Sequence, residues 1–319
     1  MNSLDVLLSP VILFFVLGAA AAFARSDLSI PEAIAKGMSL YLMAAIGLKG
    51  GVEVNASGFT VQMLSAALAG VALSFLLPLP AFFALRRFGG LNPVNAGAVA
   101  AHYGSVSVVT FVTGVEVLGA GGMPPAGYMV AVLALMETPA IIMGLWLARR
   151  GARSAGHPGG EMLRETLLNG SVVLLVGSFL IGLIAGKQGF APIAPVFEAG
   201  FRGVLCLFLL DMGLIAARRL RDARALTARL ALLAILFPIV NGTIGVLIGA
   251  AIGLDPGSTS ALGILAASAS YIAVPAAMRL ALPEADPGLY LAMSLAVTFP
   301  FNLTAGIPLF AWLASQVAS

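Results

Sequence analysis

The chain has 319 residues, of which 60% are hydrophobic and only 10% charged, and its mean hydropathy is +1.03. A soluble domain carries about 25% charged residues, so this composition leaves too little polar surface for a protein in water and predicts one in a lipid bilayer. It excludes a cytosolic enzyme and a nucleic-acid-binding protein. The formal net charge of +3 comes from lysines and arginines at the ends of apolar segments, where they indicate membrane orientation.

Ten apolar stretches are each about long enough to cross a hydrocarbon core of about 30 Å, which takes about 20 helical residues. In chain order they cover residues 8–24, 32–50, 59–84, 93–115, 126–148, 165–186, 196–217, 226–252, 257–279 and 288–315. We therefore predict an all-α integral membrane protein with ten transmembrane helices.

The basic residues give an independent test of this count. If the N-terminus lies outside, fourteen of the seventeen Lys and Arg residues fall at the inner ends of the spans, and only Lys49, Lys187 and Arg202 fall elsewhere. Positive charge is enriched on the cytoplasmic side of membrane proteins. We therefore predict a multi-pass protein of the bacterial inner (plasma) membrane with both termini on the periplasmic side.

The two halves of the chain show a weak internal repeat. The polar segment 151–164 is predicted to be a cytoplasmic linker between residues 1–150 and residues 165–319. The aligned pairs are Gly47 with Gly213, Pro93 with Pro256, Ser105 with Ser268, Ser107 with Ser270, and Pro139 with Pro300. Because five spans is an odd number, the second half enters the membrane from the opposite side. We predict two inverted five-helix repeats with discontinuous helices at the midplane, an architecture typical of transporters.

Two matched serine segments are the predicted substrate-binding site. The first is Gly104, Ser105, Val106 and Ser107; the second is Ser268, Ala269 and Ser270. Glycine and serine at mid-membrane let a helix unwind, so that N–H groups and hydroxyls face a ligand. Half-helix N-termini suit an anion, while freed carbonyls suit a sodium ion. The alternative is that these small residues serve only close helix packing.

Polar residues at membrane depth are the predicted cation-binding residues. They are Glu137, Ser107, Ser270, Asn241 and Asn302. A lone acid in an apolar span is costly, so Glu137 is expected to face a cavity or a cation. A protonated structural glutamate, and interhelical hydrogen bonds by the two asparagines, are the alternatives.

Other functional classes fit less well. A channel needs a continuous polar pore, and an intramembrane enzyme needs a nucleophile with a base in reach. Ser105 follows His102 by three residues, but the serines recur in the second half without a histidine. The chain has neither a phosphate-binding P-loop nor an HExxH zinc motif. We predict a transporter and no enzyme, with no cofactor, no catalytic residues and no metal beyond sodium.

The order of several short motifs resembles that of the sodium-dependent bicarbonate transporters, best known from cyanobacteria. The motifs are Ile30-Pro31-Glu32-Ala33-Ile34, Ile46-Gly47-Leu48, Gly50-Gly51, Phe201-Arg202-Gly203, Met212-Gly213, Pro238-Ile239-Val240, Ala266-Ala267-Ser268 and Ile307-Pro308-Leu309-Phe310. The resemblance implies a homotrimer in which a core domain, spans 3–5 and 8–10, moves against a gate domain, spans 1–2 and 6–7. It also implies bicarbonate as substrate and sodium as coupling ion, bound at the serine segments.

The chain departs from the cyanobacterial pattern at several positions. Tyr271 stands where that family has Asp after the second serine segment, Glu137 replaces an Asp, and Asn241 replaces a His. Family members with a longer linker meet a PII-like cytoplasmic regulator, a partner that we do not assume for the short linker here. The basic run that begins at Arg218 is most simply an inner-face anchor for spans 7 and 8, and contact with anionic membrane lipid or with a cytoplasmic regulator are the alternatives. The alternatives to sodium-coupled bicarbonate uptake are an organic-anion/sodium symporter of the bile-acid type and, less favoured, an ion channel.

Overall fold

The computed structural model describes residues 10–152, 170–222 and 226–318, and every regular element in these ranges is helical. In chain order the elements are α2 (Pro10–Phe23), α3 (Glu32–Ser57), α4 (Val61–Leu76), α5 (Pro78–Arg87), α6 (Pro93–His102), α7 (Val108–Ala120), α8 (Met129–Met136), α9 (Pro139–Ala152), α11 (Gly170–Phe190), η1 (Pro195–Ala199), α12 (Phe201–Asp222), α13 (Ala228–Ala251), α14 (Pro256–Ala267), α15 (Ala273–Ala281), α16 (Pro287–Leu291), η2 (Ala292–Thr298), α17 (Phe299–Phe301), η3 (Asn302–Gly306) and α18 (Ile307–Val317). The predicted linker 151–164 lies almost wholly outside the described residues.

Polar residues start several of these helices where the sequence has few other polar groups. The Asn92 side chain accepts a hydrogen bond from the backbone N–H of Asn95, and Asp255 accepts one from Ser258. A proline follows each of these caps, and its fixed φ suits the first helical position. The short polar gaps between apolar runs therefore define where α6 and α14 begin.

Six helical segments within the described residues are long and apolar enough to cross a membrane. They are Val61–Arg87, Met129–Arg150, Val173–Phe190, Pro195–Arg221, Ala228–Ala251 and Pro287–Val317. Each overlaps one of the ten predicted spans. The chain is thus a multi-pass, all-helical membrane protein, while the count of ten crossings stays a prediction.

The four other predicted spans differ from a single long apolar helix in specific ways. The helix α2 has only 14 residues, and α3 has 26 residues but includes charged ones. The stretches 93–115 and 257–279 are each divided into two helices, α6 with α7 and α14 with α15. Both breaks fall at serine-bearing segments, residues 103–107 and 268–272, so apolar length in the sequence does not become continuous helix.

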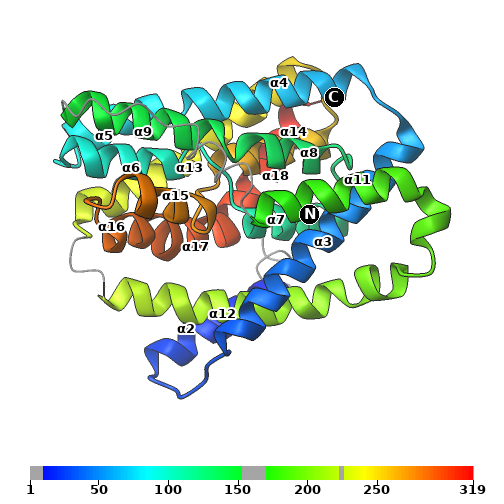
Figure 1. Ribbon diagram of the computed structural model, residues 1–319, viewed down its shortest axis with the longest axis horizontal. Coiled ribbons are helices and arrows are strands. Elements are labelled where there is room, and N and C mark those ends of the chain that lie inside the picture. The colour runs from blue at the N-terminus through cyan, green and yellow to red at the C-terminus, as the bar shows by residue number, and fades with distance from the viewer. Residues whose placement is uncertain (1–9, 153–169, 223–225, 319) are drawn as a thin grey trace.

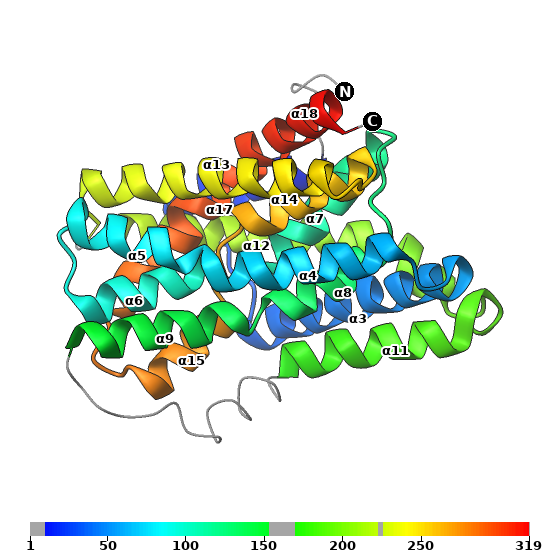
Figure 2. The same ribbon diagram turned by 90° about the horizontal axis from the view of Figure 1, so that it is seen from above.

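The helices pack in close pairs, of which two, α2 with α12 and α3 with α11, join the two halves of the chain. Helix α2 runs along α12, α3 runs along α11, α6 runs along α9 and α13 runs along α14. Figure 1 shows α2 with α12 along the lower edge, and both views show α3 beside α11. In Figure 2, α13 and α14 lie together on the side opposite α11. Each half of the chain therefore contributes helices to the same bundle.

Glycines lie where two of these helix pairs come closest together. A Cβ on Gly51 would lie 2.0 Å from the carbonyl oxygen of Phe179, and one on Gly213 would lie 2.1 Å from that of Phe15. These distances leave no room for a side chain, so α3 meets α11, and α12 meets α2, backbone against backbone. Such contacts are common between membrane helices, where packing replaces the hydrophobic effect.

Candidate functional site

Two interrupted helices meet at the centre of the molecule. Helix α6 ends at His102 and α7 begins at Val108, while α14 ends at Ala267 and α15 begins at Ala273. We call residues 103–107 the first interruption and residues 268–272 the second interruption. All seven predicted substrate-binding residues lie in these two segments.

Hydrogen bonds join the first interruption and the end of α6 to the second interruption. The Ser107 N–H donates to the Ser268 hydroxyl oxygen at 3.0 Å, and the Ser270 N–H donates to the His102 carbonyl at 3.0 Å. The His102 ring also bonds the Ser270 carbonyl through Nδ1. Backbone groups released by unwinding must find partners inside the membrane. Here each interruption supplies partners for the other, which brings the serine segments together.

The serine hydroxyls at the two interruptions cap the N-terminal ends of the helices that follow. The Ser107 hydroxyl oxygen accepts a hydrogen bond from the Thr110 N–H at 3.2 Å, and that of Ser270 accepts one from the Val274 N–H at 3.3 Å. These bonds satisfy first-turn donors of α7 and α15. The N-terminal ends of both helices, which carry partial positive charge, therefore start at the same place.

A small cavity opens where these helix ends converge. Its volume is about 10 Å³, which is room for roughly one water molecule or one ion of that size. It is lined by Met43, Val106, Ser107, Val108, Glu137, Ser270, Tyr271 and Ile272. Met43 comes from α3, so the cavity lies between that helix and the interrupted helices. The predicted residues Gly104, Ser105, Ser268 and Ala269 lie beside the cavity without lining it.

Glu137 is the acidic residue of this cavity. Its side chain is 4% exposed, and it has no ion pair within the described part of the chain. Its carbonyl accepts a hydrogen bond from the Ser105 hydroxyl at 3.0 Å, which ties the first interruption to the break between α8 and α9. A carboxylate buried without a basic partner is costly unless a cation or a proton neutralises it.

Polar residues outside the predicted set also hydrogen-bond at the breaks around the cavity. The Ser74 hydroxyl donates to the Met136 carbonyl at 2.6 Å and accepts from the Ala140 N–H at 3.2 Å, and so fills the break around Pro139. The Tyr103 hydroxyl lies 2.8 Å from the hydroxyl of Thr298. Ser74 is a lone serine in an apolar span, and such a serine can hydrogen-bond at a helix break or can serve only close helix packing. The sequence does not distinguish these two roles.

Asn241 and Asn302 lie outside the cavity. The Asn241 amide donates to the Tyr103 carbonyl at 3.2 Å, and the Asn302 amide donates to the Ala267 carbonyl at 2.9 Å. Each holds a carbonyl next to one interruption. The Asn302 side-chain oxygen is buried with no hydrogen-bond partner among the described residues. Cation binding by these two residues stays a prediction, and their observed contacts are structural.

Tyr271 occupies the position where the resembled pattern has an acid, and it lines the cavity. Its ring packs edge-on against Phe299, with centroids 5.2 Å apart. Its hydroxyl is buried close to Ser107, without the geometry of a hydrogen bond. The site therefore keeps a polar hydroxyl where it lacks a second carboxylate.

The described residues contain no group of three or more His, Cys, Asp or Glu side chains that could hold a metal ion. A sodium ion at the cavity would be bound by hydroxyl and carbonyl oxygens with at most one carboxylate. Oxygen ligands of this kind at unwound helices are the usual sodium site of secondary transporters.

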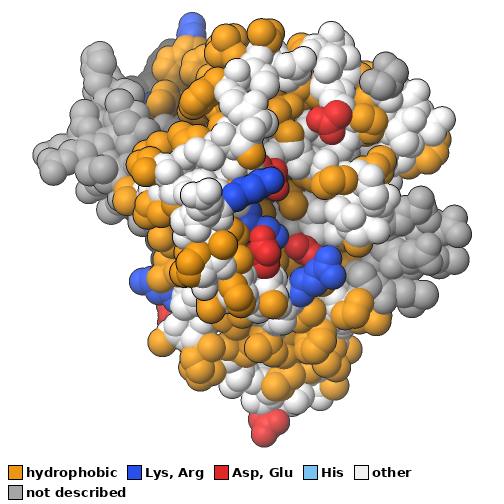
Figure 3. All heavy atoms as spheres, turned by 90° about the vertical axis from the view of Figure 1, so that its right-hand side faces the viewer, with side chains coloured by type: hydrophobic (Ala, Val, Ile, Leu, Met, Phe, Trp, Pro, Cys, Tyr) orange, Lys and Arg blue, Asp and Glu red, His pale blue; other side chains and the backbone are white. Residues whose placement is uncertain are grey.

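Charged side chains gather at one end of the molecule. Figure 3 shows acidic and basic groups near the middle of this face, surrounded by apolar atoms. Arg202 of α12 donates to the Glu116 carboxylate of α7 at 2.7 Å, and the Glu53 carboxylate of α3 lies against Gly127. Both contacts join α3 or α12 to the part of the chain that carries the first interruption.

Comparison with known protein families matches the sequence profile of the Na+-dependent bicarbonate transporter superfamily to residues 10–315. A search of curated proteins finds no match. The profile covers nearly the whole chain, including both interruptions and the cavity, and it is that of a transporter and not of an enzyme. The chain thus belongs to the Na+-dependent bicarbonate transporter superfamily.

Proposed function

We propose that the protein is a secondary active transporter that couples bicarbonate uptake to sodium entry by alternating access. The observation that carries this proposal is the convergence of the N-terminal ends of α7 and α15 on a cavity lined by Glu137. Positive helix ends favour an anion, and the carboxylate favours a cation. One small site thus offers both charges that a sodium–anion symporter needs.

Coupling follows from electrostatics. An anion in a low-dielectric site is costly, and a sodium ion bound beside it cancels most of that cost. Each ion therefore raises the affinity of the other, and the loaded site is easier to move than a half-loaded one. We assign the anion to the interruptions, at Ser107 and Ser270, and the sodium ion to Glu137 with the nearby hydroxyl and carbonyl oxygens.

The size of the cavity implies movement. A volume of about 10 Å³ is too small for bicarbonate, which has four non-hydrogen atoms, so the site must widen to load. Met43 on α3 lines one side of it. We propose that α2, α3, α11 and α12 form the gate domain and that the remaining helices form a core domain that slides against it in an elevator motion.

The helix pairs support the inverted repeat on which this motion depends. Helix α2, the first of the described helices, packs along α12, and α3 packs along α11. If α2 and α11 open the two repeats, each first helix packs on the second helix of the other repeat. This exchange is what a two-fold axis in the membrane plane would produce. We propose the same axis for the two interruptions, and a homotrimer held by the gate domains.

Bicarbonate requires much less widening of this cavity than the organic anions of bile-acid-type symporters, which favours the small anion. Uptake of labelled bicarbonate into proteoliposomes, at alkaline pH so that dissolved CO2 is negligible, tests the proposal. We expect uptake that requires an inward sodium gradient and saturates, with little competition by bile acids. Uptake that ignores the sodium gradient would contradict symport, and stronger uptake of a bile acid than of bicarbonate would favour the organic-anion function.

Bulky side chains test the site itself. Ser107→Phe or Ser270→Phe is expected to abolish uptake because either fills the cavity, while Ser315→Phe on the exposed end of α18 is the matched control. Folding of each variant is checked by its elution as a single species in detergent. Normal uptake by a correctly folded Ser107→Phe variant would remove the interruptions from the binding site.

A further inference from the structure

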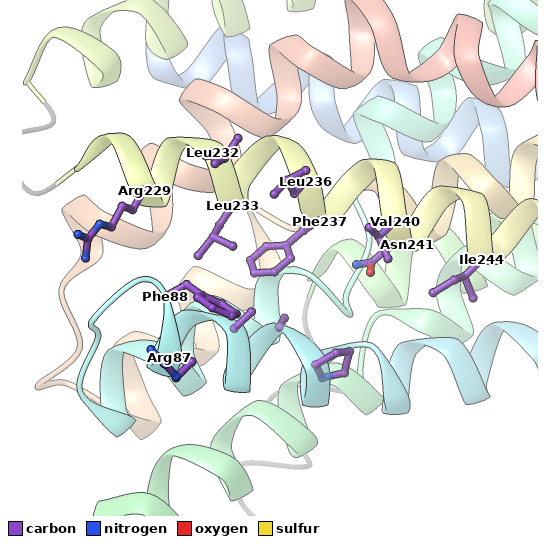
Figure 4. Close-up of a pocket in the computed structure, with 13 residues that line it drawn as sticks. Arg87, Phe88, Arg229, Leu232, Leu233, Leu236, Phe237, Val240, Asn241 and Ile244 are labelled. Atoms are coloured by element: carbon purple, nitrogen blue, oxygen red, sulfur yellow. The ribbon is translucent and has the colours of Figure 1, made fainter.

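A long groove lies on the surface between α13 and the α4–α5 segment, apart from the cavity described above. Its volume is about 660 Å³. It is lined by Pro80, Ala81, Ala84, Arg87, Phe88, Arg229, Leu232, Leu233, Leu236, Phe237, Val240, Asn241 and Ile244. Figure 4 shows Phe88, Leu233 and Phe237 pointing into the space between the two helices. The groove's apolar walls are open to the surroundings, so an acyl chain can enter it.

One end of the groove is basic. Arg87 ends α5 and Arg229 lies in the first turn of α13, so both stand at the same end of the groove (Figure 4). No acidic residue is among the described residues that line it, and neither arginine has an ion pair within the described ranges. Two guanidinium groups without acidic partners are suited to bind a phosphate, which accepts paired N–H donors.

Apart from Asn241, the rest of the groove is apolar, and its rim is exposed. Leu232, Val240 and Phe88 are 57%, 53% and 60% exposed. Ile244 follows Arg229 by fifteen residues along α13, which corresponds to about 22 Å of helix at about 1.5 Å per residue. One leaflet of the hydrocarbon core is about 15 Å thick. The groove therefore has the length of a headgroup region followed by one leaflet of acyl chain.

We propose that this groove binds an anionic phospholipid, with its phosphate between Arg87 and Arg229 and an acyl chain along α13. The arginines distinguish an anionic lipid from a zwitterionic one, whose own positive charge offsets its phosphate. The apolar walls distinguish a lipid from a free phosphate ion. Both arginines lie at ends that the charge pattern assigns to the cytoplasmic side, so the lipid belongs to the inner leaflet.

The bound lipid would contact a residue that supports the transport site. Asn241 lines the groove, and its amide donates to the Tyr103 carbonyl at the start of the first interruption. An acyl chain against Asn241 stabilises this contact by excluding water and other lipids from it. Transport is therefore expected to need anionic lipid. This consequence depends on the proposed function, whereas lipid binding itself does not.

Native mass spectrometry of the delipidated full-length protein tests the proposal without any transport assay. Phosphatidylglycerol and phosphatidylcholine of equal chain length are added separately. We expect about one tightly retained phosphatidylglycerol per chain and at least tenfold weaker retention of phosphatidylcholine. Arg87→Gln combined with Arg229→Gln should weaken phosphatidylglycerol binding at least tenfold. The matched control, Arg86→Gln combined with Lys36→Gln, removes the same charge outside the groove and should bind normally.

Four results would overturn the proposal. Equal retention of the two lipids, or equal weakening by both double variants, would show that no specific headgroup site exists. Displacement of the lipid by glycerol phosphate at equal concentration would show a plain anion site. The variant Leu236→Trp, which keeps both arginines and fills the groove, should also reduce lipid binding. If it instead lowers the oligomeric mass with lipid binding intact, the groove is a protein interface.

Discussion

At the residue scale, the cavity combines one carboxylate with one phenol in an apolar setting. Glu137 has no basic partner within the described ranges, and the Tyr271 hydroxyl has no hydrogen bond there. Buried polar groups without partners are rare in proteins, and a bound ligand is one explanation for them. Both side chains line the same small space, so we assign the cation to the carboxylate and part of the anion's hydrogen bonding to the phenol.

The variant Glu137→Gln is expected to lose sodium-stimulated uptake, because the amide keeps the size of the side chain but not the charge that attracts a cation. Uptake of labelled bicarbonate is measured against external sodium concentration. We expect the sodium response to fall at least about tenfold, as loss of about 1.4 kcal/mol or more in cation binding predicts. Glu137→Asp, which keeps the negative charge, should retain part of the sodium response. An unchanged sodium response in Glu137→Gln would place the sodium site elsewhere.

The variant Tyr271→Phe tests the phenol. Hydrogen bonds to charged groups contribute about 1.5–3 kcal/mol, so loss of the hydroxyl should raise the KM for bicarbonate about tenfold or more. Tyr41→Phe, which removes a hydroxyl bonded to the Val196 carbonyl away from the cavity, is the control and should leave the KM unchanged. Equal KM values in the two variants would show that the anion does not contact Tyr271.

At the element scale, close helix contact depends on residues without side chains. On α3, Gly51 meets the backbone of α11, whereas Gly37 has no atom within 4 Å of the position a Cβ would take. The two positions share one helix, so the general gain in helix propensity from glycine to alanine, about 1 kcal/mol, applies to both. The difference between them isolates the packing contact.

Gly51→Ala is expected to destabilise the protein, because the added methyl must push α3 and α11 apart and overpacking typically costs about 1–3 kcal/mol. Thermal unfolding in detergent should show a Tm lower by several degrees than that of Gly37→Ala, which should match or exceed the parent. If the two variants unfold at the same temperature, α3 and α11 do not meet backbone to backbone in the membrane.

At the scale of the whole molecule, the Arg202–Glu116 ion pair joins the proposed gate domain to the proposed core domain. Arg202 is 69% exposed and Glu116 is 16% exposed, so solvent weakens the pair. Exposed ion pairs contribute about 0–1 kcal/mol. That range is small for folding, yet it is enough to bias two conformations of similar free energy, since about 1 kcal/mol changes their ratio about fivefold.

Arg202→Gln is therefore expected to favour the state in which the cavity opens at this end. Met43→Cys in a Cys206→Ser background reports the opening, through its rate of labelling by a membrane-impermeant thiol reagent. We expect labelling up to about fivefold faster with Arg202→Gln. The exchanged pair, Arg202→Glu with Glu116→Arg, should return the rate toward the parent. An unchanged labelling rate would show that this ion pair does not influence the opening of the cavity.

Much of this protein can be predicted from its sequence because lipid imposes a simple rule on composition. A span must be long and apolar, and charge must stay at its ends. The six described helices that meet this rule coincide with predicted spans, and the motif order indicates the family that the profile match shows. Ser107 and Ser270 are predictable because a pair of hydroxyls repeated at mid-membrane in both halves of an apolar chain indicates a polar site there.

The contacts between distant segments were not predictable. The sequence does not indicate that Met43 of α3 lines the cavity or that Ser74 hydrogen-bonds across the break at Pro139. It also does not indicate that the Asn241 amide donates to the Tyr103 carbonyl. These contacts depend on how helices from the two halves pack, and many packings satisfy the same apolar pattern. Hydropathy is a local property of the chain, whereas a binding site and a lipid groove are shaped by side chains far apart in sequence, which only the folded bundle brings together.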